Sequence, residues 1–168
     1  PVEPAGPAPS DERAGGRSTA DDPRVDILRR AYRLFNDKDV DGFVALLDPD
    51  IVWPDLSGGP SLRGAEAVRS YWRNAFSVVS ARVVPHEFLV DDDAVIVVIE
   101  REVLDLQGHS LGSPAVVVHR VTFRDGRIAK LSITTSDLDT PKYVLDRFRA
   151  VHDISAGGGA ATGAPRAD

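Results

Sequence analysis

The spacing of apolar residues changes from helical to extended partway along the chain. Over residues 24–37, apolar side chains recur on one helical face and charged side chains on the other, which predicts an amphipathic helix. Asp39 stands where an N-cap is expected for a second, short helix. A third helix is predicted to follow Gly64. From Ala81 onward the apolar residues alternate with polar ones or form short continuous runs, as strands do.

The second half of the chain predicts a series of antiparallel strands. They are expected at residues 81–90, 94–106, 115–124 and 127–135. Asp125-Gly126 is a strong hairpin signal because both residues tolerate the positive φ of a type I′ turn. A shorter strand is expected at 51–53 after a turn at 48–50, and a last helix over 141–152. This order predicts an α+β fold, in which a cone-shaped, curved antiparallel sheet is wrapped by three N-terminal helices, with a C-terminal helix added.

Both ends of the 168-residue chain differ in composition from its middle. Residues 1–22 and 154–168 consist mostly of Pro, Ala, Gly, Ser and charged residues, with too few large apolar side chains to offset the entropy of ordering them. We therefore expect two disordered tails around one domain of residues 23–153, a common size for a single domain.

Charge and residue usage exclude several classes of protein. The net charge is −6 and no basic cluster is present, so we expect neither nucleic-acid binding nor a membrane surface. The absence of cysteine excludes disulfides and a thiolate nucleophile. The four histidines show no ligand spacing, so no metal is expected. Without a long apolar run, a cytoplasmic protein is expected.

Asp55 follows the end of the first predicted strand. The strand stops at Trp53, Pro54 breaks it, and a Gly/Pro-rich loop leads to Gly64. A carboxylate at such a point can face an apolar cavity, which raises its pKa and makes it a usable base. The alternative is an Asx turn that caps the loop.

His119 lies in the middle of the predicted strand 115–124 and shares a face with Val121 and Phe123. If this face lines the cone, a neutral imidazole could donate a hydrogen bond to a carbonyl, and an imidazolium could protonate a leaving oxygen. The alternative is a core histidine whose hydrogen bond goes to a backbone carbonyl.

Glu100 and Glu102 interrupt an apolar strand on one face. They line the cavity if that face is turned inward. Otherwise they are solvated and pair with Arg101 or Arg120.

Large aromatic residues occur at core spacings in the predicted helices and strands. Beside Asp55 they would also form walls that stack on a flat, hydrophobic ligand. The candidates for substrate binding are Tyr32, Trp53, Tyr71, Trp72 and Phe123.

The chain resembles the SnoaL-like polyketide cyclase and ketosteroid isomerase group of the nuclear transport factor 2-like fold. The resemblance rests on residues 36–47, on Val52-Trp-Pro-Asp55, on Gly64 with the helix after it, and on the hairpin at 123–128. In ketosteroid isomerases the base is an Asp after the first strand, and Asp55 falls on that position. His119 occupies the place of the oxyanion-hole Asp. The place of the Tyr falls on Ala31, with Tyr32 one residue out of register.

The resemblance implies a cofactor-independent acid/base enzyme for a hydrophobic, carbonyl-bearing small molecule such as a polyketide. Asp55 would act as base and His119 as the polarising acid. The reaction could be isomerisation, cyclisation, dehydration or epoxide opening. The alternative is a non-catalytic binding or dimerisation module of the same fold. The resemblance also implies a homodimer that pairs through the outer face of the sheet.

Overall fold

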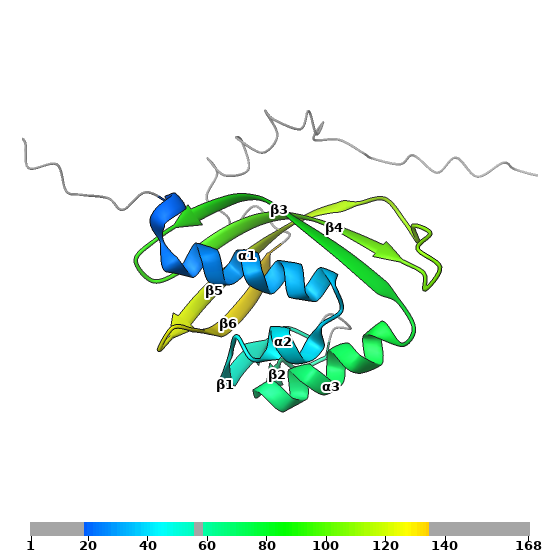
Figure 1. Cartoon of the computed structure of the whole chain (residues 1–168), viewed down its shortest axis with the longest axis horizontal. Helices are drawn as coiled ribbons and strands as arrows, with labels where there is room; N and C mark the ends of the chain where they lie inside the picture. The colour runs from blue at the N-terminus through cyan, green and yellow to red at the C-terminus, as the bar shows by residue number, and fades with distance from the viewer. Residues whose placement is uncertain (1–18, 56–58, 135–168) are drawn as a thin grey trace, which may run out of the picture.

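In the part of the chain that the structure describes, three helices lie inside the curve of one sheet (Figure 1). The computed structural model describes residues 19–55 and 59–134. The helices are α1 (Pro23–Asn36), α2 (Val40–Val44) and α3 (Ala65–Phe76), and a 3-10 turn, η1 (Thr19–Asp21), precedes them. The predicted α+β class is confirmed. The expected last helix at 141–152 lies outside the described residues.

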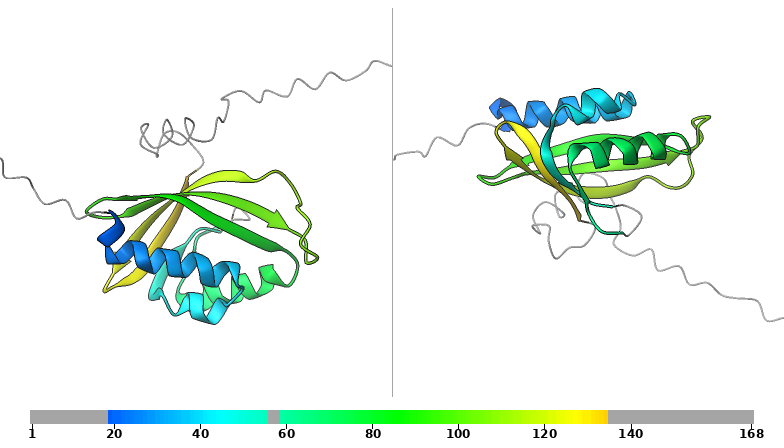
Figure 2. Two further views of the ribbon diagram at one scale, coloured as in Figure 1. Left: turned by 45° about the horizontal axis from the view of Figure 1, so that its top comes forward. Right: turned by 90° about the horizontal axis from the view of Figure 1, so that it is seen from below.

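Over residues 19–55 and 59–134, the sheet has six strands and does not close into a barrel. Its spatial order is β2-β1-β6-β5-β4-β3. The strands are β1 (Leu47–Trp53), β2 (Leu62–Arg63), β3 (Ser80–Val90), β4 (Val95–Leu104), β5 (Ala115–Arg124) and β6 (Arg127–Thr134). Both views of Figure 2 show its strong curvature. The predicted curved sheet is confirmed, and the structure adds one parallel pair, β1 with β6, to the antiparallel meander.

β1 begins at Leu47, earlier than its apolar run indicates. Leu47 pairs with Ile128 of β6, and the register then shifts before Val52 pairs with Lys130. Asp48 accepts a hydrogen bond from the Asp50 amide at 2.8 Å, which is the local turn chemistry that the sequence predicts at 48–50. The predicted turn is therefore an irregularity within a strand, because pairing with β6 continues on both sides of it.

Side-chain caps and glycine fix where the helices begin. Asp22 caps α1 and accepts from the Arg24 amide at 2.9 Å, and Asp39 caps α2 through the Gly42 amide at 2.9 Å. The predicted role of Asp39 is confirmed. Gly64 stands before α3 with φ 91°, a conformation that only glycine adopts readily.

The hairpin between β5 and β6 is the predicted type. Asp125 and Gly126 both have positive φ, at 51° and 74°, and they connect the paired residues Arg124 and Arg127. Because the turn twists with its strands, β5 and β6 pair along most of their length.

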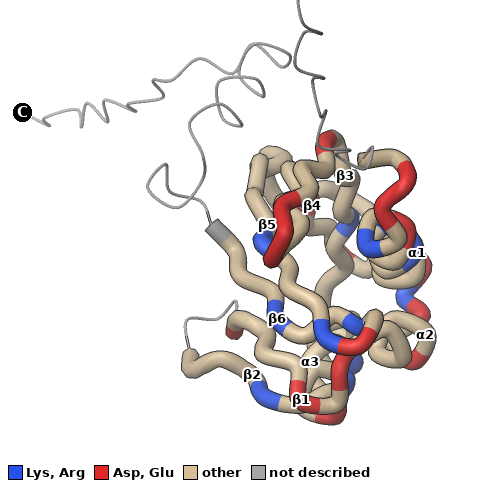
Figure 3. The backbone as a smooth tube through the Cα atoms, turned by 90° about the vertical axis from the view of Figure 1, so that its left-hand side faces the viewer, with Lys and Arg blue, Asp and Glu red and all other residues tan. Residues whose placement is uncertain are grey.

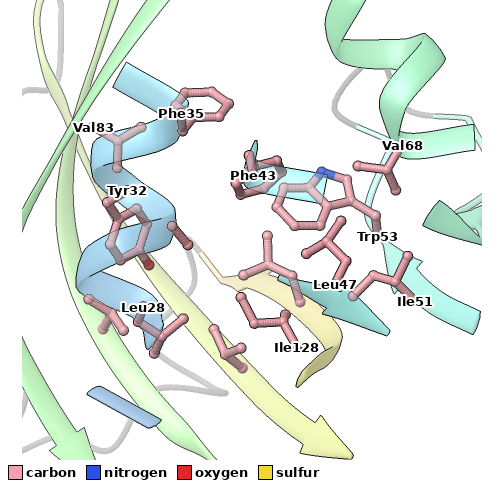
Figure 4. Close-up of a cluster of buried hydrophobic side chains, with 14 of the residues drawn as sticks. Leu28, Tyr32, Phe35, Phe43, Leu47, Ile51, Trp53, Val68, Val83 and Ile128 are labelled. Atoms are coloured by element: carbon pink, nitrogen blue, oxygen red, sulfur yellow. The ribbon is translucent and has the colours of Figure 1, made fainter. Parts of the chain in front are cut away.

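An aromatic cluster joins the helices to the sheet (Figure 4). The Phe35 ring on α1 lies 5.9 Å from that of Phe43, 4.7 Å from that of Trp72 and 5.2 Å from that of Phe76, measured between ring centroids. Trp53 closes the cluster from β1, at 5.5 Å from Phe43. These contacts fix α1, α2 and α3 against the sheet. Over the described residues, no helix has the length and apolar character needed to cross a bilayer.

Candidate functional site: an apolar cavity with a buried tyrosine–histidine pair

A cavity of about 270 Å³ lies between the helices and the inner face of the sheet. This volume is close to the lower end of small-molecule sites, roughly 300 Å³. Its walls come from α1, α2, α3, β1 and the inward faces of β3 to β6, and they are almost entirely apolar. Four predicted binding residues line it, namely Tyr32, Trp53, Tyr71 and Trp72. In Figure 4, Tyr32 of α1 and Trp53 of β1 both point into the interior that the helices and the sheet enclose.

Tyr32 and His119 form a buried hydrogen-bonded pair at the wall of this cavity. The Tyr32 hydroxyl lies 2.9 Å from His119 Nδ1, and the two rings are stacked at 5.9 Å. Helical spacing turns Tyr32 inward from the middle of α1, and strand alternation turns His119 inward from β5 together with Val121. Sequence reasoning named both residues, but it did not predict that they would bond to each other.

Burial keeps both members of the pair neutral. Removal of water lowers the pKa of His119 to about 4, and the positive charge of Arg101 lowers it further. The same desolvation raises the pKa of Tyr32 above its ordinary value. At neutral pH the pair therefore consists of an imidazole and a phenol, and His119 carries no positive charge.

The pair retains one hydrogen-bond donor that its mutual bond does not use. A neutral imidazole and a phenol carry one polar hydrogen each, and only one of the two is spent between them. In one tautomer the free donor is His119 Nε2–H, and in the other it is the Tyr32 O–H. Among residues 19–55 and 59–134, neither group has another hydrogen-bond partner. The cavity wall thus offers one donor to the oxygen of a ligand.

Arg101 brings a positive charge into the cavity, and sequence reasoning missed it. Together with Ile99 and Val103 it faces inward from β4. Basic and acidic residues are interspersed over the described elements (Figure 3). Among the described residues that line the cavity, however, Arg101 is the one with a charged side chain. Its Nε has no hydrogen-bond partner, and no described carboxylate lies within ion-pair distance of it.

Of the two orientations that the sequence leaves open for Glu100 and Glu102, the same alternation supports the outward one. Because Ile99 and Arg101 point inward, the two glutamates point to the outer face, and neither lines the cavity. Glu102 stands opposite Arg82 in the register of β3 and β4. The outer face of β4 is itself apolar at Val98, which is 1% exposed, so the apolar pattern did not distinguish the two faces.

Asp55 and Phe123 also lie outside the cavity lining. Asp55 follows β1 by two residues, is partly buried, and turns its carboxylate toward Gly59. Phe123 comes after a register shift in β5 and packs against the core without reaching the cavity. The described residues contain no group of three or more His, Asp or Glu that could hold a metal ion.

An apolar cavity inside a curved α+β sheet is typical of nuclear transport factor 2-like proteins. The chain belongs to the SnoaL-like domain family, which matches residues 28–131. No curated protein matches it.

Solved structures share the fold. TerC, co-crystallised with polyporic acid, is 24% identical with a TM-score of 0.59, over 75% of this chain and 97% of its own. A candidate polyketide cyclase from Sinorhizobium meliloti is 29% identical, with a TM-score of 0.56 over 65% and 94% of the two chains. An epoxide hydrolase of the LEH-like type from Mycobacterium tuberculosis is 20% identical, with a TM-score of 0.59 over 79% and 97%. The family and these neighbours support an enzymatic or ligand-binding role with a small molecule.

Proposed function

We propose that the chain is a cofactor-independent acid/base enzyme that acts on a hydrophobic, carbonyl-bearing small molecule such as a polyketide. One observation carries this proposal: a neutral Tyr32–His119 pair with a free donor lies in the wall of an apolar cavity. Such a donor can hold the oxygen on which negative charge develops when a proton leaves the neighbouring carbon. The apolar walls strengthen this hydrogen bond because they exclude water.

His119 polarises the carbonyl as a neutral donor in this proposal. With a pKa of about 4 the imidazole carries only one ring proton at neutral pH, so it acts as a hydrogen-bond donor and not as an imidazolium acid. Tyr32 holds the imidazole in place through the bond to Nδ1. In the tautomer with Nε2–H, the substrate oxygen accepts from His119 directly.

Asp55 is the proposed base. It lies two residues beyond Trp53, which lines the cavity, and the proposal requires its carboxylate to turn from Gly59 toward the bound ligand. The base would take a proton from the carbon next to the carbonyl, and the electron pair would move to the oxygen held by His119. Return of the proton from Asp55 to a different carbon would complete an isomerisation. Attack of the enolate carbon on a second carbonyl of the same molecule, with the proton passing from Asp55 to the oxygen of that carbonyl, would complete a cyclisation.

The test is deuterium exchange into 2-tetralone, a bicyclic ketone with acidic α-hydrogens, followed by proton NMR in D₂O. We expect the protein to accelerate exchange and Asp55→Asn to reduce this acceleration by about 10²–10⁴-fold. Asp125→Asn is the matched control, since it makes the same change in an exposed turn where Asn tolerates positive φ. Exchange at the unmutated rate in Asp55→Asn would remove Asp55 as the base.

A second candidate function is ligand binding without catalysis. It is favoured by one observation, because no carboxylate is among the described residues that line the cavity. Binding of 2-tetralone without any faster exchange would support this alternative. The homodimer implied by the resemblance stays a prediction, and analytical ultracentrifugation of the full chain tests it.

A further inference from the structure

We propose that the cavity selects hydrophobic organic anions, whose carboxylate or ionised enol pairs with Arg101. This inference rests on the proposed function, because it assumes that the natural ligand occupies the same cavity. It goes further by assigning the charge of the ligand and the residue that recognises it.

Arg101 places a positive charge at an apolar cavity with no ion-pair partner among the described residues. A guanidinium keeps its charge at any physiological pH, and a charge surrounded by apolar side chains loses hydration that only an opposite charge or hydrogen-bond acceptors can replace. Arg101 shares the cavity with Ile99, Val103 and Tyr71, and no described carboxylate pairs with it. An anionic ligand would supply the missing acceptor atoms.

The Tyr32–His119 pair agrees with this assignment, because it adds one free donor to the cavity wall. A wall with donors and no carboxylate is complementary to a ligand that is rich in oxygen acceptors.

Arg101 and His119 can act on one ligand together. The charge of Arg101 is close enough to His119 to lower the pKa of the imidazole, so the two groups face a shared region of the cavity. An acidic group bound to Arg101 would then place a neighbouring ring or carbonyl against the Tyr32–His119 pair. In this arrangement Arg101 fixes the orientation of the ligand, and the Tyr32–His119 pair contacts an uncharged oxygen of the ligand.

The test compares two probes of nearly equal shape, 2-naphthoate and the neutral ketone 2-acetylnaphthalene, at pH 7. Both tryptophans of the chain line the cavity, so quenching of intrinsic fluorescence reports binding directly. We expect the full-length protein to bind the carboxylate about ten to a hundred times more tightly than the ketone, as for a hydrogen-bonded charge pair. Arg101→Gln should abolish this preference and leave the affinity for the ketone within about threefold.

Arg120→Gln is the matched control. Arg120 is exposed on the outer face of β5, so this variant removes the same charge from the protein without touching the cavity. It should keep the preference for 2-naphthoate. A second readout separates recognition from structure: Arg101→Gln should melt at the same temperature as the unmutated protein or higher, because it removes an unpaired charge from apolar surroundings.

The possible results have different consequences for the Arg101 assignment and for the proposed function. Equal affinity for both probes, or a preference that survives Arg101→Gln, overturns the assignment of Arg101 while the cavity stays a ligand site. Failure of both probes to bind overturns the assignment together with the proposed function. Loss of the preference in Arg120→Gln would show that it reflects the overall charge of the protein, and this outcome also overturns the proposal.

Discussion

The buried imidazole of His119 makes the stability of the fold depend on pH. In the unfolded chain its pKa has the ordinary value of 6.5, whereas burial in the folded protein lowers the pKa to about 4. Above pH 6.5 the imidazole is neutral in both states, so the fold has its full stability. Between pH 6.5 and 4 the unfolded chain takes up a proton that the folded chain does not, so the free energy of unfolding falls as the pH falls. Below pH 4 both states are protonated, and this group causes no further loss.

The size of the effect follows from the two pKa values. Their difference corresponds to about 3 kcal/mol over the whole window, since each pKa unit is worth about 1.4 kcal/mol. Most of this, about 2–3 kcal/mol, should be lost between pH 7.5 and 4.5. Against a typical domain stability of about 5–15 kcal/mol, the loss is large enough to measure.

The assay is urea unfolding between pH 4.5 and 7.5, for the unmutated protein and for His119→Gln. Gln can still hydrogen-bond Tyr32, but it does not titrate. The carboxylates and the exposed histidines, His86 and His109, are common to both proteins, so the difference in their pH dependence isolates His119. We expect the unmutated protein to lose about 2–3 kcal/mol more than the variant across this range. Parallel pH profiles would refute a neutral, buried His119.

Three further predictions concern the fold and are measured by the same unfolding assay. Phe35→Ala removes a ring in contact with three other aromatic rings and should cost about 3–5 kcal/mol, whereas Val78→Ala at a 69% exposed position should change stability by less than about 0.5 kcal/mol. Gly64→Ala should lower the free energy of unfolding by about 1–3 kcal/mol because φ is 91° there. Gly112→Ala should lower it less, because the added Cβ meets no atom within 4 Å. Asp39→Ala should cost about 1 kcal/mol by removing the cap of α2, and no loss would contradict the capping bond.

Local pattern was sufficient to predict most of the elements. Capping residues and apolar spacing predicted α1, α2 and α3, and the Asp125-Gly126 turn predicted the hairpin of β5 and β6. The parallel pairing of β1 with β6 was not predictable in the same way, because it joins Leu47 to Ile128, which are far apart in the sequence. Parallel pairs carry no turn signal between their strands, so local residues cannot reveal them.

The cavity shows where sequence reasoning about the site was incomplete. His119 was placed inward by alternation, and the structure pairs it directly with Val97 of β4. Directly opposed residues of antiparallel strands share a face, so this register also turns Ile99 and Arg101 inward and Glu100 outward. Both faces of β4 are apolar, and only the register with β5 could have distinguished them. The pairing of β4 with β5 therefore indicates which face of β4 points into the cavity, whereas the sequence of β4 alone does not.

The chemistry of the cavity follows from which charged and polar side chains line it. Without Glu100 and Glu102, the described lining contains donors and one positive charge, and it holds no group that is negative at neutral pH. Such a wall stabilises negative charge on a ligand, whether the charge is already present or forms during a reaction. A ligand that arrives as an anion needs no base, and Arg101 alone accounts for its recognition. A ligand that becomes an anion in the cavity needs a base from outside the lining, and Asp55 is the candidate. The Asp55→Asn variant therefore distinguishes the two proposals. It should remove most of the accelerated proton exchange, which depends on the base, and leave the preference for 2-naphthoate, which depends on Arg101, unchanged.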